Sequence, residues 1–96
     1  MTFDGENLLK VEYLVNKETQ RFESVYIHYK DKKSFSKFVD RFKNILGEES
    51  LIFKDVYTDP QIKSYIWEKE QPIHVRVNEQ YPWVTYGTIA IRYTGQ

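Results

Sequence analysis

The chain has 96 residues, of which 41% are hydrophobic and 29% are charged, and 14 lysines and arginines balance 14 aspartates and glutamates. This length predicts a single domain over residues 1–96, and the composition excludes an intrinsically disordered chain, while the lack of cysteine excludes disulfides and cysteine-ligated metals. The zero net charge disfavours a dedicated nucleic-acid-binding protein, and we expect a cytoplasmic protein because no signal peptide or membrane-length apolar run is visible.

Two alternating segments near the N-terminus predict an antiparallel hairpin. Residues 1–7 show no periodic pattern, and we expect a loose segment there. Apolar and polar side chains alternate over residues 8–15 and again over residues 22–30, and the polar residues 16–20 form the turn between them. The face predicted to be buried comprises Leu9, Val11, Tyr13, Val15, Val25, Ile27 and Tyr29.

The clearest pattern in the chain is that of an amphipathic helix. Apolar residues recur every three or four positions and form one stripe, which consists of Phe35, Phe38, Val39, Phe42, Ile45 and Leu46. Asp31 or Ser34 can cap the N-terminal end, and Gly47 can end the helix in a left-handed conformation. The sequence therefore predicts one long helix whose apolar stripe packs against a sheet.

The second half of the chain alternates again. Residues 51–57, 73–77 and 83–94 predict three strands. Residues 60–70 fit either a short helix or a strand, and we favour the helix because Pro60 directly follows an aspartate, a pairing typical of helix starts. The resulting order β-β-α-β-(α)-β-β predicts an α+β domain: a mainly antiparallel sheet of about five strands with one long amphipathic helix on one face.

Few residues are suited to catalysis. The two histidines, His28 and His74, fall on predicted strands and on the faces away from the helix, so they would meet only if those strands were neighbours. Neither histidine has a metal-binding spacing, the acidic residues do not converge, and no glycine-rich phosphate loop is present. We therefore expect no enzyme, no metal and no cofactor, and we keep a site centred on the two histidines as the weakest alternative.

The sheet face opposite the helix is the first candidate surface for a partner. Its aromatic, arginine and histidine side chains are types enriched at protein interfaces, and they also stack on bases in single-strand binders. They are equally typical of an ordinary solvated sheet face. Trp67 joins the candidates because it points outward if residues 60–70 are helical, and the loop over residues 81–83 is a further candidate. The partner-binding candidates are Tyr26, His28, Trp67, His74, Arg76, Tyr86 and Arg92.

A basic stripe on the long helix is the second candidate surface. Lys33, Lys37 and Arg41 are spaced four residues apart and therefore lie on one line along the helix. Such a line can contact phosphates or an acidic protein surface, but an exposed helix face also carries lysines simply because it is solvated.

These patterns favour a small non-catalytic protein-binding module or a homo-oligomer subunit, in which a sheet edge such as the long terminal strand pairs across a two-fold axis. The alternative is a nucleic-acid-binding protein that uses the basic helix stripe or the aromatic sheet face. The abundance of lysine, tyrosine and isoleucine is typical of AT-rich genomes, so we expect an adaptor, inhibitor or assembly component of a phage or mobile element.

The apolar stripe generates a first prediction. Phe42→Asp is expected to unfold the domain, because it places an unpaired charge in the middle of the predicted core. Circular dichroism during thermal melting measures this effect, and a variant that stays soluble and melts cooperatively would show that the stripe is not core.

Overall fold

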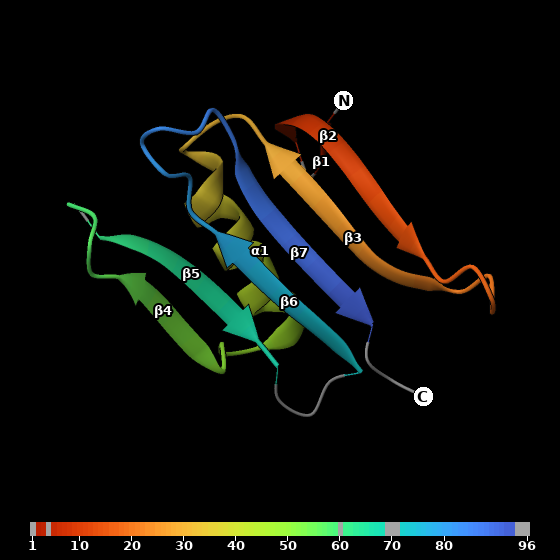
Figure 1. Ribbon diagram of the computed structural model, residues 1–96. Helices are drawn as coiled ribbons and strands as arrows, with labels where there is room; N and C mark the ends of the chain where they lie inside the picture. The colour runs from red at the N-terminus through yellow and green to blue at the C-terminus, as the bar shows by residue number, and fades with distance from the viewer. Residues whose placement is uncertain (1, 4, 60, 69–71, 94–96) are drawn as a thin grey trace.

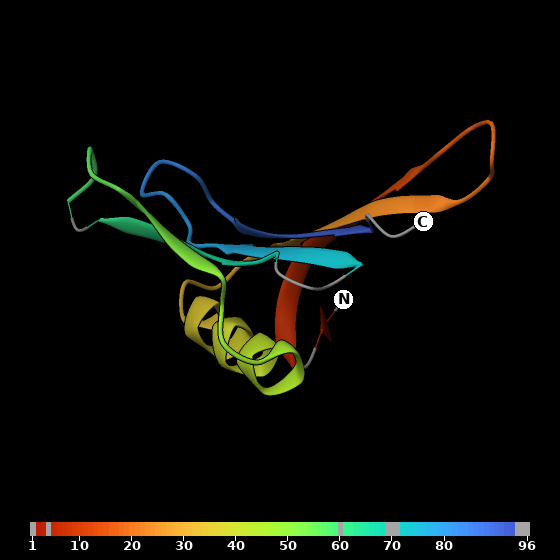
Figure 2. The ribbon, with the colours of Figure 1, turned by 90° about the horizontal axis from the view of Figure 1, so that it is seen from below.

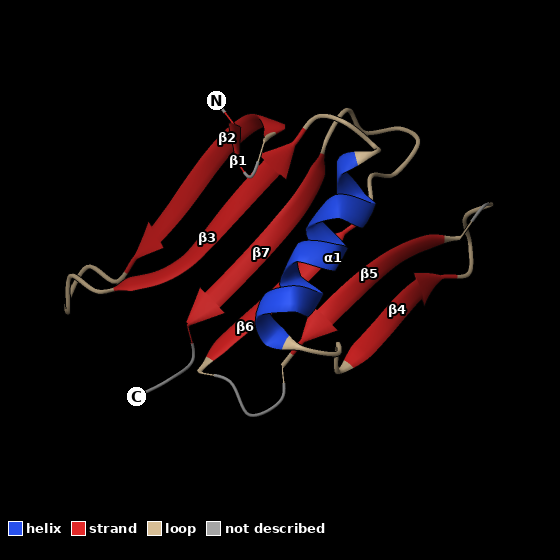
Figure 3. Cartoon of the chain, turned by 180° about the vertical axis from the view of Figure 1, so that it is seen from behind, coloured by secondary structure: helices blue, strands red, loops and turns tan. Residues whose placement is uncertain are grey.

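A computed structural model describes residues 2–3, 5–59, 61–68 and 72–93 of the chain. Over these residues the protein is an α+β domain, with one helix packed on one face of an antiparallel sheet of seven strands (Figures 1 and 3). The fold class and the single long helix are confirmed, whereas the sheet has more strands than the predicted five. The elements are β1 (Thr2–Phe3), β2 (Glu6–Val15), β3 (Phe22–Tyr29), α1 (Ser34–Leu46), β4 (Leu51–Asp55), β5 (Ile62–Trp67), β6 (Ile73–Asn78) and β7 (Gly87–Tyr93).

The C-terminal strand lies in the middle of the sheet. The strand order is β1-β2-β3-β7-β6-β5-β4, so β7 joins a group built from the N-terminal half to a group built from β4, β5 and β6. In this register Ala90 of β7 lies opposite both Tyr26 of β3 and Arg76 of β6. The prediction that the terminal strand is a free sheet edge is therefore wrong, because alternation reveals the buried face of a strand but not its neighbours.

The predicted short helix is also wrong over residues 61–68, the part of residues 60–70 that the structure describes. Residues Ile62–Trp67 form strand β5, which pairs with β4 on one side and with β6 on the other. Isoleucine, tyrosine and tryptophan favour strands, and pairing along both edges outweighs the local helix-start signal.

The N-terminal segment is more ordered than the sequence predicts. Thr2 lies opposite Asn7, and Phe3 lies opposite Glu6, so β1 and the start of β2 form a small antiparallel pair. Gly5, which lies in the turn between them, has a φ of 82° that suits a residue without a Cβ atom.

An irregularity in β2 changes which of its side chains are buried. The register with β3 shifts between Leu8 and Lys10, which is the mark of a β-bulge, and Leu8 rather than Leu9 therefore enters the core. Farther along, Tyr13 and Val15 are exposed. Figure 2 shows the reason, since the β2–β3 hairpin extends beyond the end of the helix.

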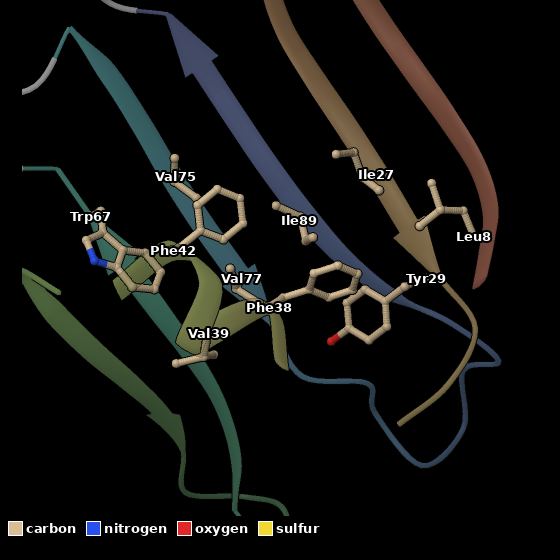
Figure 4. Close-up of a cluster of buried hydrophobic side chains, with 10 residues drawn as sticks. All are labelled: Leu8, Ile27, Tyr29, Phe38, Val39, Phe42, Trp67, Val75, Val77 and Ile89. Atoms are coloured by element: carbon tan, nitrogen blue, oxygen red, sulfur yellow. The ribbon is translucent and has the colours of Figure 1, made fainter. Parts of the chain in front are cut away.

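The core lies between α1 and the middle of the sheet (Figure 4). Phe38, Val39 and Phe42 are buried, and Phe35 and Leu46 pack against the same cluster, which confirms most of the predicted stripe. Ile45 departs from the prediction because it is exposed. The sheet contributes Leu8, Ile27, Tyr29, Trp67, Val75, Val77 and Ile89.

The helix ends differ in how well the sequence predicts them. Neither Asp31 nor Ser34 caps the N-terminus, because the N-cap is Lys33, which makes no side-chain capping bond. Ser34 instead donates its hydroxyl to Glu6 Oε1 at 2.7 Å, which places a carboxylate beside the positive end of the helix. Gly47 ends the helix with the positive φ expected of a glycine, 85°, but its ψ of −158° lies outside the left-handed helical conformation that the sequence predicts. Its N–H donates to the carbonyl of Lys43.

A close contact between Tyr29 and Gly87 fixes how β3 and β7 align in the sheet. A Cβ atom on residue 87 would lie only 2.2 Å from Cζ of Tyr29, so the ring needs a glycine opposite it. The Tyr29 hydroxyl donates to the carbonyl of Asn78 at 2.5 Å, and its ring packs against Phe38 with centroids 5.2 Å apart. Burial raises the pKa of Tyr29 well above its ordinary value, so the hydroxyl remains a donor. One side chain of β3 therefore contacts β7, β6 and α1.

Gly87→Ala tests this contact. We expect the free energy of unfolding in urea to fall by about 1–3 kcal/mol or more, because the added methyl group overlaps the Tyr29 ring. The same substitution in a Tyr29→Ala background is the control and should cost much less, since the ring is gone. An equal cost in both backgrounds would exclude the proposed contact as its cause.

Candidate functional site

The sheet face away from α1 is open and concave. We call it the outer face, and it carries Tyr26, His28, His74, Arg76, Ala90 and Arg92, whose neighbours along each strand point toward the helix. Figure 2 shows that the β2–β3 hairpin, the β4–β5 turn and the loop before β7 all rise on this side of the sheet. The structure therefore gives the predicted partner surface the shape of a trough.

A groove with a volume of about 540 Å³ lies on the outer face. Ala90 lies between Tyr26 and Arg76, so its small side chain leaves space between two large ones. Sequence alone places Ala90 on this face but not between these two residues, because that position depends on strand order. The groove is lined by Tyr26, Ile66, Glu68, His74, Val75, Arg76, Asn78, Thr88, Ala90 and Arg92.

Two arginines in the groove have no counter-charge among the described residues. Arg92 lies directly opposite His74 and diagonally across from Arg76, a position in which Cβ atoms are about 7–8 Å apart. Among the described residues, no carboxylate forms an ion pair with either guanidinium, including Glu68 on the groove wall. The two guanidinium groups can therefore converge on an anionic group that enters the groove.

His28 is held by its neighbours rather than offered to a ligand. Its Nε2 lies 2.7 Å from Glu12 Oε1, and its Nδ1 lies 3.1 Å from the hydroxyl of Thr88. The Tyr86 ring meets the imidazole edge-on, with centroids 5.0 Å apart. Because both ring nitrogens of His28 are bonded and its side chain is buried, His28 supports the outer face rather than binds at its surface.

The two histidines do not meet. His28 on β3 lies opposite Thr88, whereas His74 on β6 lies opposite Arg92, four residues farther along the intervening strand β7. Two strand spacings of about 4.8 Å and four residues of about 3.3 Å put them roughly 16 Å apart. In the part of the chain that the structure describes, no three His, Asp or Glu side chains are grouped so that they could hold a metal ion.

Trp67 belongs to the core. It is buried on the helix side of β5, where its indole N–H donates to the carbonyl of Gly47 at 2.9 Å and its ring lies beside Phe42. Its prediction as a partner-binding residue is therefore wrong, and the cause is the mistaken helix over residues 60–70. The exposed tryptophan is Trp83, whose side chain is 74% accessible. It lies in the loop before β7, where the centroid of its ring is 4.9 Å from that of the Tyr81 ring.

The basic helix stripe lies on the other side of the molecule. Lys33, Lys37 and Arg41 are all exposed on α1, but Lys37 Nζ lies 3.4 Å from Glu6 Oε2 and is partly neutralised. Arg76 and Arg92 belong to the outer face, and α1 lies on the opposite side of the sheet, so a ligand on the outer face does not reach the stripe (Figure 2).

Comparisons of the chain with protein-family models, with curated proteins and with solved structures found no significant match. Among the described residues, no helix has both the length and the apolar character needed to cross a membrane.

The Glu12–His28 pair predicts a pH dependence. The hydrogen bond from His28, together with the charge of Lys10, lowers the pKa of Glu12 below its ordinary value. The stability that this pair contributes is therefore complete above the pKa of unfolded glutamate, about 4.3, and is lost as the pH falls through the lower folded pKa.

Carboxyl NMR titration measures this pKa directly. We expect His28→Ala to move the pKa of Glu12 back toward its ordinary value. Thr88→Val is the control, because it removes the other partner of His28 and leaves the Glu12 contact in place. An unchanged Glu12 pKa in His28→Ala would contradict the assignment.

Proposed function

We propose that the protein is a small non-catalytic binding module that holds a protein partner on its outer face. The observation that carries this proposal is a concave groove of about 540 Å³ that contains Arg76 and Arg92 without a described counter-charge. Arginine and tyrosine are the side chains that most often anchor protein interfaces, and a groove accepts a protruding partner side chain.

The groove also favours a particular partner chemistry. Two guanidinium groups beside a low-dielectric wall attract carboxylates and bind them through paired hydrogen bonds. The methyl group of Ala90 and the side chain of Ile66 add an apolar contact beside this charge. A partner segment with an acidic side chain next to an apolar one fits this surface. Binding such a segment would let the protein act as an adaptor, inhibitor or assembly component.

The test compares two double variants with matched side-chain types. Tyr26→Ala/Arg76→Ala removes a tyrosine and an arginine from the groove, whereas Tyr13→Ala/Arg21→Ala removes the same types from exposed positions outside it. Each tagged protein, checked for folding by circular dichroism, is used to capture partners from a lysate of the source organism, which are quantified by mass spectrometry.

We expect the groove variant to lose a partner that the control variant retains, because an interface anchor contributes about 2 kcal/mol or more, roughly a 30-fold change in affinity. Equal capture by both variants would contradict the proposal.

A single-stranded nucleic acid is the second candidate ligand. It is favoured by Tyr26 and Arg76, which lie on an open sheet face on either side of Ala90, an arrangement in which bases stack on the ring and phosphates meet the cation. It is opposed by the zero net charge of the chain. Fluorescence anisotropy with labelled oligonucleotides at low salt distinguishes the two candidate ligands. Binding that weakens steeply with salt and disappears in Tyr26→Ala/Arg76→Ala would favour a nucleic acid over a protein as the ligand of the groove.

A further inference from the structure

Strand β4 has an edge that no described strand covers. It lies at the end of the sheet, with β5 on one side and no described strand on the other. It exposes apolar side chains on both faces, since Leu51 and Phe53 are 56% and 54% accessible on the outer face and Ile52 is 37% accessible on the helix side. β4 pairs with β5 without a register shift, so no bulge interrupts its edge, and its two charges, Lys54 and Asp55, lie together at its C-terminal end.

The edge at the opposite end of the sheet, formed by β1 and β2, is less regular than that of β4. There β1 covers the beginning of β2, and the register of β2 with β3 shifts twice. Lys10 and Glu12 add charges along the rest of this edge, and Lys10 Nζ lies 3.6 Å from Glu12 Oε1. Both ends of the sheet expose apolar side chains, but the three consecutive apolar residues of β4 lie in a regular register, whereas the register of β2 shifts between Leu14 and Val15. We therefore take β4 as the edge suited to pairing with another strand.

We infer that β4 pairs with β4 of a second copy of the chain, antiparallel, about a two-fold axis that is perpendicular to the sheet and passes midway between the two copies of Phe53. Antiparallel pairing of identical edges is self-complementary, because the free N–H and C=O groups of each copy meet those of the other. Centring the pair on the middle residue engages all five residues of β4, with Phe53 beside its counterpart and Ile52 opposite the methylene stem of Lys54.

A second copy is the occupant that the charges favour. The chain has no net charge, so two copies meet without long-range repulsion. The interface is small, and interfaces that bury less than about 1,200 Å² are typical of weak association, so we expect a dissociation constant in the micromolar range. Because the axis is perpendicular to the sheet, both outer faces lie on one side of the dimer and both grooves stay open.

Sedimentation velocity from about 5 to 500 µM tests the dimer, a range that brackets the micromolar affinity expected for a small interface. We expect the wild-type protein to dimerise as its concentration rises and Phe53→Lys to remain monomeric, because the new charge lies beside its copy. Leu14→Lys is the matched control, since it replaces an exposed apolar residue on the β2 edge, and it should dimerise like the wild type. A wild-type protein that is monomeric throughout, or two variants that dimerise equally, would overturn the inference.

A cross-linking experiment tests the register independently of charge. The chain has no cysteine, so Phe53→Cys introduces a single thiol. Directly opposite residues of an antiparallel pair have Cβ atoms about 4.5–5.5 Å apart, which small shifts bring into disulfide range. Under mild oxidation we expect far more disulfide-linked dimer from Phe53→Cys than from Leu14→Cys, and equal yields would overturn the β4 interface.

The dimer and the proposed function are two proposals that can be disproved independently of each other. Phe53→Lys leaves Tyr26, Arg76 and Arg92 in place, so a monomeric variant can still bind a partner in the groove. Tyr26→Ala/Arg76→Ala leaves β4 unchanged and should still dimerise.

Discussion

The contact of Tyr29 with Gly87 sets the register between β3 and β7, the strand in the middle of the sheet. Only a glycine accommodates the ring at this distance, so β3 and β7 cannot slide past each other without a clash or an empty space. The same register places Tyr26, three residues earlier on β3, opposite Ala90, three residues later on β7. The contact that seals the core on one face of the sheet therefore also aligns the two sides of the groove on the other.

The polar residues of the outer face divide into two groups according to their partners. His28 is saturated by Glu12 and Thr88, and this small network braces β2, β3 and β7 against one another. Arg76 and Arg92 have no such partners among the described residues, although they lie on the same surface. Buried polar groups that bond to each other stabilise a fold, whereas cations left unpaired in a hollow are available to something that enters it. This difference, rather than residue type, separates the structural part of the outer face from the part that we propose binds a partner.

Periodicity predicts the helix and the faces of β3, β6 and β7 because each of these segments has one period and one buried side. It fails at Ile62–Trp67, where a short apolar segment fits both periods and only pairing with β4 and β6 decides between them. The error at Trp67 follows from that choice, and the error at Leu9 follows from a bulge. The groove could not be predicted at all, because it exists only when β7 separates β3 from β6, and strand order is a non-local property.

The groove and the β4 edge have consequences for each other. Arg76 lies opposite Ile66, which lies opposite Leu51 of β4. In a dimer centred on Phe53, the two copies of Arg76 are five strand spacings of about 4.8 Å and four residues of about 3.3 Å apart, or roughly 27 Å. A partner with two acidic segments at that separation gains affinity from simultaneous contact, because its second contact becomes intramolecular. A weak groove and a weak edge can thus produce strong binding together, provided that the partner is itself repetitive or dimeric.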